Sequence, residues 1–229
     1  MKQNIKIYFL CLAVIIAYVG YVASCKHDDL VLPEGALNVQ RGDASIGFND
    51  GKTTFDKVHS NVNWSSPYLG EVSLLTGRFN MFGFKTFNFV ENNPDSIYFD
   101  AWVSLTTVNT SEPARDGGCL QTNFFESKAG DAGYIDTVAE IKSTKVVYNT
   151  ADRGYIVTAD LYFRGVTKSI TARLDYSGKT SETFNGSTFD VYGFGLTFSI
   201  LSQTDFGVPT GETADQVDIS CHANFNHKQ

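Results

Sequence analysis

Apolar and polar residues alternate along residues 97–106. The apolar positions are Ile97, Phe99, Ala101, Val103 and Leu105. Successive side chains of a β-strand point to opposite faces, so this period of two predicts a half-buried strand. Tyr98 and Trp102 lie on the other face, which indicates that this face is partly covered.

The alternation ends in residues 107–126, where a polar turn is followed by large aromatic side chains. Pro113 disfavours a helical conformation at the residue before it. Two glycines and the pair Phe124-Phe125 follow. We expect a compact segment here, with a short helical turn near residues 118–126, that closes one end of a sheet structure.

Similar strand patterns recur along the chain and are separated by turn residues. The expected strands, about eight, are residues 53–64, 71–82, 97–106, 139–148, 154–163, 169–176, 189–200 and 215–225. The chain has 18 Phe and 11 Tyr but only 2 Met and 5 Pro, which favours strands over helices. Regular short strands of this kind predict an antiparallel barrel or sandwich.

The interior of such a barrel is expected to be apolar, because nearly all inward positions carry hydrophobic side chains. An eight-stranded barrel has an interior that its own side chains can fill, or that can hold one small ligand. Alternation alone does not decide between a filled core and a cavity for an apolar guest.

The first 24 residues are expected to form a targeting segment. Lys2 and Lys6 precede an almost unbroken apolar run over residues 7–23. The run ends in small residues before Cys25, which resembles the lipobox of bacterial lipoproteins. By that resemblance Cys25 is the acylated first residue of the mature chain, with palmitate-type acyl chains as its anchor. The alternative is an uncleaved transmembrane anchor.

The domain organisation that follows is a signal peptide over residues 1–24, a lipidated tether over residues 25–50 and a folded domain over residues 51–229. The tether region contains at most one short strand. Lys26 directly after the cysteine favours the outer membrane, and Lys26-His27-Asp28-Asp29 also resembles a surface-export signal. We therefore expect the protein in the cell envelope, on the periplasmic face or the cell surface.

The charge of the chain argues against nucleic acid as a partner. The formal net charge is −7, and loss of the two lysines of the targeting segment would make it −9. An acidic surface without a compensating run of Lys or Arg repels phosphate backbones.

Six short stretches occur in the order typical of a known family. They are Phe55-Asp56 with His59-Ser60, Gly77-Arg78-Phe79, Arg115-Asp116 with Leu120 and Phe124-Phe125, residues 142–145, residues 165–168 and residues 204–208. This order resembles the YceI-like family, also called the polyisoprenoid-binding family, over residues 52–225. The resemblance implies an all-β fold: a single antiparallel, lipocalin-like, eight-stranded barrel with a short helical turn, located in the periplasm or envelope.

The resemblance also implies an elongated apolar cavity that holds an isoprenoid chain, such as a quinone tail or a polyprenyl lipid. Together with the alternation it predicts the residues that line this cavity: Phe79, Phe99, Val103, Phe124, Phe125, Phe163, Leu196 and Phe198. His59 and Arg115 are further candidates for ligand contact. For each the alternative is a structural role, for His59 at the barrel mouth and for Arg115 in a pair with Asp116. No cofactor other than the bound lipid is expected, and a homodimer is possible.

Enzymatic activity is not expected. His59 and Ser60 are neighbours on a strand and face opposite sides, so the histidine cannot readily activate the hydroxyl. No nucleophile elbow is present. The alternatives kept open are a hydrolase, a redox partner of a bound quinone, and a structural lipoprotein with a filled barrel.

Two cysteines remain in the folded domain, Cys119 and Cys221. In an oxidising compartment they can form a disulfide, or both can be buried free thiols. A metal site from these cysteines with His59 and His222 is disfavoured, because their spacing is unlike that of zinc ligands.

Overall fold

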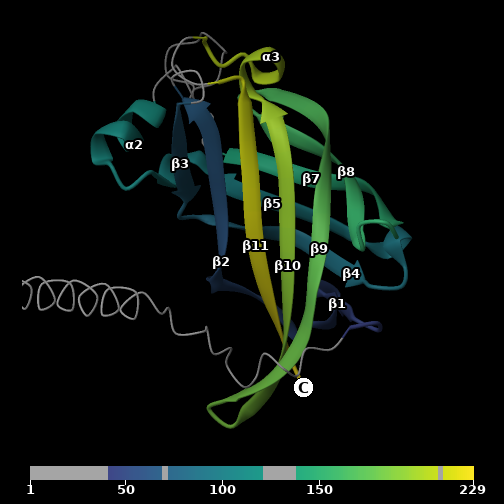
Figure 1. Ribbon diagram of the computed structural model, residues 1–229. Helices are drawn as coiled ribbons and strands as arrows, with labels where there is room; N and C mark the ends of the chain where they lie inside the picture. The colour runs from purple at the N-terminus through teal and green to yellow at the C-terminus, as the bar shows by residue number, and fades with distance from the viewer. Residues whose placement is uncertain (1–40, 69–71, 121–137, 211–213) are drawn as a thin grey trace, which may run out of the picture. The chain divides into compact units, whose positions relative to one another are not determined.

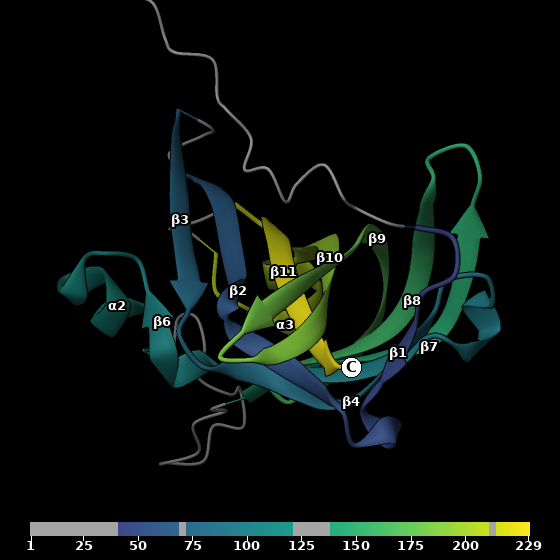
Figure 2. The ribbon, with the colours of Figure 1, turned by 90° about the horizontal axis from the view of Figure 1, so that it is seen from below.

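The computed structural model describes residues 41–68, 72–120, 138–210 and 214–229. These residues contain eleven strands in one antiparallel sheet that curls into a barrel (Figure 1). The strands are β1 (Ser45–Gly47), β2 (Thr53–Tyr68), β3 (Ser73–Phe79), β4 (Phe82–Val90), β5 (Tyr98–Ser104), β6 (Val108–Asn109), β7 (Val138–Asn149), β8 (Gly154–Phe163), β9 (Val166–Phe184), β10 (Ser187–Leu201) and β11 (Gln216–Lys228). Their order in the sheet is β1-β4-β5-β7-β8-β9-β10-β11-β2-β3-β6. Seen from below, the strands surround a common interior (Figure 2).

The predicted all-β barrel is confirmed, but the structure has more strands than the eight expected. The strands not expected are the two-residue β6 and the longer β4, which contains four inward aromatic residues. Its phenylalanines stand at 82, 84, 87 and 89, because the pairing with β5 shifts between Phe84 and Thr86. This bulge breaks the period of two, so the segment does not read as one alternating strand.

Two short strands also enlarge the sheet. β1 lies in the region expected to be a linker with one short strand, and it pairs with β4. β6 is only two residues long and pairs with the end of β3. Two backbone hydrogen bonds tie this part of the sheet to the turn between β3 and β4: Asn80 N donates to Thr107 O at 3.0 Å and Ser104 N donates to Met81 O at 2.8 Å.

The turn between β8 and β9 needs two residues with positive φ. Arg164 has φ 52° and Gly165 has φ 72°. Two-residue hairpins favour this conformation because its twist matches that of the flanking strands. The side chain of Arg164 is buried, and its Nε donates a hydrogen bond to Phe206 O at 3.3 Å. This turn therefore also holds the helical segment at residues 202–206.

The helices of the described part are short. α2 (Pro113–Cys119) and α3 (Ser202–Phe206) are accompanied by 3-10 turns η2 (Phe48–Asp50), η3 (Pro94–Ser96) and η4 (Leu105–Thr107). None of the helices in this part is long and apolar enough to span a membrane. The helix expected near residues 118–126 begins earlier, with Pro113 at its first position and Glu112 extended as its N-cap. Residues 121–126 lie outside the described part.

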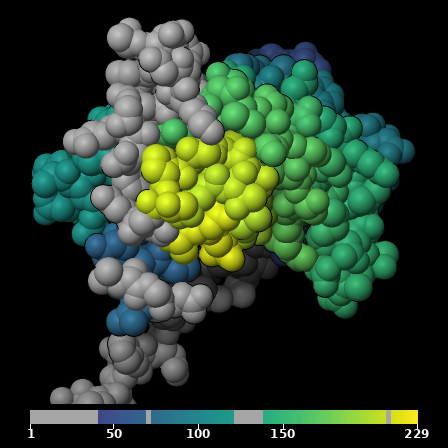
Figure 3. Space-filling view, turned by 90° about the horizontal axis from the view of Figure 1, so that it is seen from above, coloured from purple at the N-terminus to yellow at the C-terminus, as the bar shows by residue number. Residues whose placement is uncertain are grey.

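The buried apolar residues form two clusters. The first contains Phe87, Phe89, Phe99, Phe194 and Phe225 together with residues of β1, β8 and β9. The second contains Phe79, Leu105, Cys119, Phe163 and Phe206, beneath α2 and α3. Viewed from above, residues around α3 (yellow) cover the middle of this end, with α2 (teal) to one side (Figure 3).

Candidate ligand cavity

A cavity of about 410 Å³ lies between the two clusters. Its wall includes Phe87 and Phe225 from the first cluster and Phe79 and Phe163 from the second. The barrel is thus neither hollow throughout nor filled throughout. The volume falls within the ~300–1,000 Å³ that is typical of small-molecule sites.

Alternation along the strands builds the wall. Every second residue of β11 from Val217 to Phe225 lines the cavity, and so does every second residue of β10 from Phe194 to Ile200. The central strand β5 contributes its inward positions in the same way. At a rise of about 3.3 Å per residue, the lining part of β11 is about 26 Å long. The cavity is therefore elongated along the strands.

The serine hydroxyls of the wall are already occupied by protein partners, whereas the buried Nε1 of Trp64 has none among the described residues. Ser66 Oγ donates to Gln216 O at 3.0 Å, and Ser202 Oγ donates to Asp215 O at 3.0 Å. A ligand therefore meets a surface that offers van der Waals contact and few hydrogen bonds.

Two charged residues line the cavity within the described part of the chain, Arg115 on α2 and Glu140 on β7. Glu140 Oε1 lies 2.6 Å from Lys85 Nζ, and the hydrogen bond between them raises the pKa of the lysine. Arg115 is exposed to solvent as well as lining the cavity. It therefore stands where the cavity meets the exterior.

The structure places most of the predicted contact residues at this wall. Those that line the cavity are Phe79, Phe99, Val103, Phe163, Leu196, Phe198 and Arg115. Phe124 and Phe125 lie outside the described residues. Whether these side chains contact a ligand stays a prediction.

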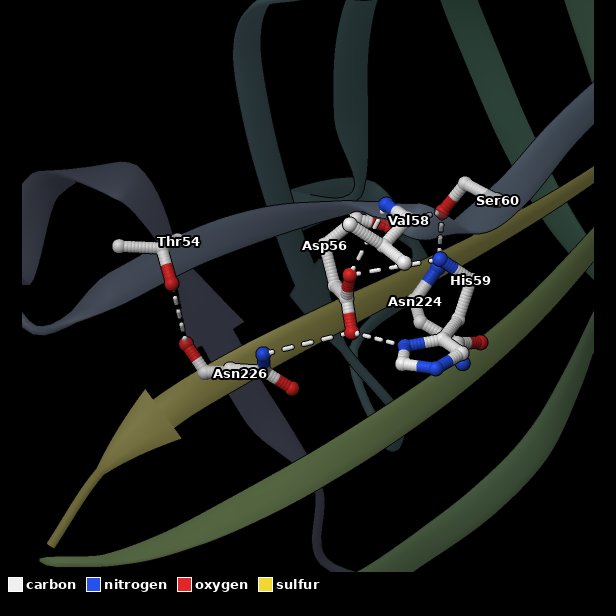
Figure 4. Close-up of polar contacts among 7 residues, drawn as sticks. All are labelled: Thr54, Asp56, Val58, His59, Ser60, Asn224 and Asn226. Atoms are coloured by element: carbon white, nitrogen blue, oxygen red, sulfur yellow. Dashed lines mark hydrogen bonds and ion pairs between the residues drawn. The ribbon is translucent and has the colours of Figure 1, made fainter. Parts of the chain in front are cut away.

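His59 does not line the cavity, and whether it contacts a ligand stays a prediction. It lies on a bulge of β2, where residues 57–60 interrupt the pairing with β11. Figure 4 shows Asp56 at the centre of this bulge. Its carboxylate accepts hydrogen bonds from the backbone N–H groups of Val58 and His59, at 3.1 and 3.4 Å, and from the ring of His59 at 2.7 Å.

The bulge is further tied to β11 by Ser60. Its hydroxyl donates to Asp56 O at 2.6 Å and accepts from Asn224 N at 3.0 Å. The histidine and the serine therefore bind different parts of Asp56, and no hydrogen bond joins His59 to Ser60 in the described structure. The motif of Asp56, His59 and Ser60 stabilises an irregular strand. It does not have the geometry of a nucleophile and its base.

Cys119 and Cys221 are unpaired in the structure, and Cys119 is buried whereas Cys221 is half-buried. Whether they pair in an oxidising compartment stays a prediction. Cys119 and Cys221 line the same cavity. Burial raises the pKa of Cys221 to about 12. Cys221 retains some accessible surface, but this surface faces the cavity, so the desolvation remains. Among the described residues no three His, Cys, Asp or Glu side chains gather where they could hold a metal ion.

Sequence reasoning missed several residues of the wall. Trp64 and Trp102 both line the cavity, as do Phe82, Phe84 and Phe87 of the missed strand. The signal for Trp64 was present, because it continues the alternation of β2 through Val62 and Ser66. The signal for β4 was hidden by its bulge.

Two of the short motifs meet at the end of the barrel. Lys168 Nζ, from the turn motif at residues 165–168, lies 3.4 Å from Asp205 Oδ1, from the motif at residues 204–208. Together with the buried Arg164 they hold α3 over the second cluster. These motifs therefore have a structural role at the α3 end of the barrel.

An antiparallel sheet curled around an apolar cavity defines a lipocalin-like barrel protein. The YceI-like domain matches residues 54–225, and the chain belongs to the YceI-like family. This agrees with the resemblance drawn from the motifs.

Curated relatives and solved structures are consistent with this family. A UPF0312 protein of Vibrio parahaemolyticus is 33% identical over 132 residues, which cover 56% of this chain and 64% of that protein. A UPF0312 protein of Pseudomonas fluorescens is 27% identical over 138 residues, which cover 60% of this chain and 67% of that protein.

The fold is shared with two crystal structures at low sequence identity. BcnA of Burkholderia cenocepacia matches with a TM-score of 0.54 and 16% identity, over 75% of this chain and 99% of that chain. The YceI protein of Campylobacter jejuni matches with a TM-score of 0.55 and 21% identity, over 69% of this chain and 88% of that chain. At these identities the likeness concerns the fold.

Proposed function

We propose that the protein binds the hydrocarbon tail of a long-chain isoprenoid, or of a similar amphiphile, in the cavity of its barrel. The observation that carries this proposal is the apolar space of about 410 Å³ between the two clusters. The family resemblance in the motifs supports an isoprenoid, such as a quinone or a polyprenyl lipid, as the guest.

The energetics favour such a guest. An isoprene unit is similar in size to a leucine side chain, whose burial contributes roughly 1.5–3 kcal/mol. Several buried units contribute more than about 10 kcal/mol before the cost of ordering the lipid is subtracted. Binding of this kind needs few polar contacts, which agrees with a wall whose serine hydroxyls are already bonded to backbone carbonyls.

The cavity favours this proposal over the alternative of a structural lipoprotein with a filled barrel. Ile141, Ile170 and Phe198 pack against both clusters and join them. A filled barrel would leave no space beside these side chains, whereas Ile141 and Phe198 line the cavity.

We further propose that the protein is a lipoprotein of the cell envelope, anchored in the outer membrane through acyl chains on Cys25. The sequence around Cys25 supports this proposal. Mass spectrometry of the N-terminal peptide from envelope fractions tests it. An acylated peptide that begins at Cys25 is expected, and Cys25→Ser should remove both the acylation and the membrane association. A homodimer stays a prediction, to be checked by light scattering.

The binding function can be tested by fluorescence, because both tryptophans of the chain line the cavity. Addition of a polyprenol to the purified protein should change the emission of Trp64 and Trp102 in a saturable manner. Extraction of the purified protein and mass spectrometry should recover a long-chain lipid. Absence of both effects would refute the proposal.

A matched pair of variants sharpens this test. Ala101 lines the cavity, so Ala101→Phe should occupy part of it and reduce lipid binding about tenfold or more. Thr76→Phe places the same ring on the exposed outer face of β3 and should bind lipid as the unmodified protein does. Equal binding by both variants would place the lipid elsewhere.

A further inference from the structure

We propose that the tip of the hairpin between β9 and β10, with Phe184 at its centre, inserts into the surface of a lipid bilayer and orients the barrel on the membrane. This contact lies outside the cavity and does not depend on what the cavity binds. It rests on the proposed anchoring through Cys25 only for the identity of the partner, and it adds a second membrane contact to that anchor.

The hairpin projects because its two strands extend past their neighbours. β9 pairs with β8 only up to Leu174, and β10 pairs with β11 only from Phe189 onward. The two strands nevertheless pair with each other out to Phe184 and Ser187. Figure 1 shows the hairpin extending beyond the neighbouring strands, at the end of the barrel opposite α3. The tip is therefore a two-stranded extension of the sheet.

The turn at the tip is tight and defined by its backbone. Asn185 has φ 50° and Gly186 has φ 76°, and two successive positive values are typical of a two-residue hairpin turn. Thr183 and Thr188 pair directly before this turn, and a hydrogen bond of 3.1 Å joins their hydroxyls. Phe184 is thus presented at the very end of a short, well-supported hairpin.

The tip contains no charge that insertion would remove from water. Residues 183–188 include no Asp, Glu, Lys or Arg. Phe184 is 65% exposed and belongs to neither buried cluster. The nearest charged side chain on β9 is Glu182, which limits the insertion to the tip because a buried, unpaired carboxylate is costly. This arrangement fits shallow insertion at the level of the lipid headgroups.

The position at which the tether joins the barrel identifies the partner as a membrane. Exposure alone would not, because single apolar side chains are common on protein surfaces. Arg41, the first residue of the described part, donates hydrogen bonds from Nε and Nη2 to Ser177 O, at 3.2 and 3.0 Å. Ser177 lies on β9 at the base of the projecting hairpin. The chain that leads back to Cys25 therefore starts at the base of this hairpin.

Chain lengths allow the tip to reach the anchoring membrane. Residues 25–41 span at most about 60 Å when fully extended. From Ser177 to Phe184 the strand rises by about 23 Å. A bilayer that holds acyl chains on Cys25 thus lies within reach of the tip. Because the anchor makes the second contact intramolecular, the modest affinity of one aromatic side chain is sufficient to orient the barrel.

The test uses the full-length, acylated protein in vesicles of phosphatidylethanolamine and phosphatidylglycerol that contain a nitroxide-labelled lipid. An NBD fluorophore is attached to Ser187→Cys, because Ser187 pairs with Phe184 across the hairpin. Its emission should be quenched by the nitroxide. The control is a label on Leu201→Cys, an exposed apolar position at the other end of the same strand, which should not be quenched. Unmodified protein treated with the same reagent gives the background from the native cysteines.

Substitution of Phe184 shows whether this side chain, and not the fluorophore, causes the insertion. In the labelled Ser187→Cys protein, Phe184→Asp should reduce the quenching to the level of the Leu201→Cys control. Phe184→Trp should preserve it, because tryptophan is well suited to the membrane interface. Circular dichroism should be unchanged in both variants, since residue 184 is exposed.

Equal quenching at residues 187 and 201, or quenching that survives in Phe184→Asp, would overturn the inference. So would a change in the emission of the Ser187 label that grows with protein concentration without vesicles, because the tip would then pack against a second copy of the chain. Recovery of Cys25 without acyl chains would refute the proposed anchoring, while the quenching alone decides on the tip. Failure of the polyprenol assay would refute the proposed cavity function and leave this inference intact.

Discussion

The indole of Trp64 lies over Gly77, its partner on the neighbouring strand β3. A β-carbon at residue 77 would lie 2.6 Å from Cε2 and Cζ2 of Trp64 and 2.7 Å from its Nε1. The two residues pair directly in the sheet. Trp64 lines the cavity. The absence of a side chain at residue 77 therefore allows its indole to occupy this position in the cavity wall.

Gly77→Ala should destabilise the protein. Separations of 2.6 Å are shorter than any van der Waals contact allows, so the indole or the strand must move. Overpacking of this kind costs about 1–3 kcal/mol. Urea denaturation followed by circular dichroism measures the change.

Gly83→Ala is the matched control for this prediction. The nearest ring atom to a β-carbon at residue 83 is Trp102 Nε1, at 3.3 Å. This contact is tight but can be relieved by a small shift, so the loss of stability should be clearly smaller than for Gly77→Ala. An equal loss in both variants would show that the close approach of Trp64 is not the cause.

The strands could be predicted from the sequence wherever the alternation of apolar and polar residues is unbroken. In β5, β10 and β11 every second residue is apolar, and these residues line the interior as predicted. The alternation of β4 is interrupted by its bulge, so the strand could not be recognised from a period of two. β6 is too short to carry any period, and its place depends on pairing with the distant β3.

The candidate site was predictable only in part, for a similar reason. Alternation shows which side chains point inward, and Phe99 and Leu196, which it predicts to do so, line the cavity. Whether inward side chains meet or leave a space depends on how rings from distant strands pack. The stacking of Phe87 on Phe225, at 3.9 Å and 10°, joins β4 to β11 and cannot be read from either segment alone.

Phe225→Ala should be among the most destabilising single changes. Its side chain is fully buried and contacts the rings of Phe87, Phe84 and Phe194. Loss of a buried phenylalanine costs about 3–5 kcal/mol. Phe184→Ala removes the same ring from a position that is 65% exposed, and it should change stability by less than about 0.5 kcal/mol. Comparable losses in urea denaturation would contradict the assignment of Phe225 to the first buried cluster.

The bulge of β2 should make stability depend on pH in two ranges. The hydrogen bond to Asp56 raises the pKa of His59. The protonated histidine therefore contributes its full stabilisation at pH values below the ordinary pKa of histidine. That contribution is lost as the pH rises through the raised value. Burial raises the pKa of Asp56, but the hydrogen bonds from His59 and Val58 outweigh this effect and lower it overall. The contribution of Asp56 is therefore present above its ordinary pKa and is lost as the pH falls.

Two variants separate these ranges. His59→Gln should flatten the stability profile above pH ~6.5 and weaken the acidic dependence without abolishing it, because the His59 ring is one of several causes of the lowered pKa of Asp56. Asp56→Asn should flatten both ranges and cost about 1–2 kcal/mol near neutral pH through its lost hydrogen bonds. The control is His222→Gln, which replaces an exposed histidine that has no ion pair among the described residues. A profile that changes as much in the control as in His59→Gln would exclude the His59–Asp56 pair as the cause.

The two thiols of the folded domain should be protected in the native protein. Burial raises the pKa of Cys221 to about 12, so at pH 8 only on the order of one thiol in ten thousand is ionised. Burial is also the main cause of the raised pKa of Cys119. Iodoacetamide, which reacts with the thiolate, should therefore label both residues slowly until the protein is unfolded.

Peptide mass spectrometry assigns the labelled sites and separates them from Cys11 and Cys25. Thr76→Cys introduces a thiol on the exposed face of β3 and should be labelled rapidly in the native state. Labelling of Cys119 and Cys221 in denaturant without a reductant would establish that they are free. If they react only after reduction, the two residues are joined by a disulfide and the cavity wall differs from the one described. Rapid labelling in the native state would mean that the wall at Cys221 is open to water, a poor environment for a hydrocarbon tail.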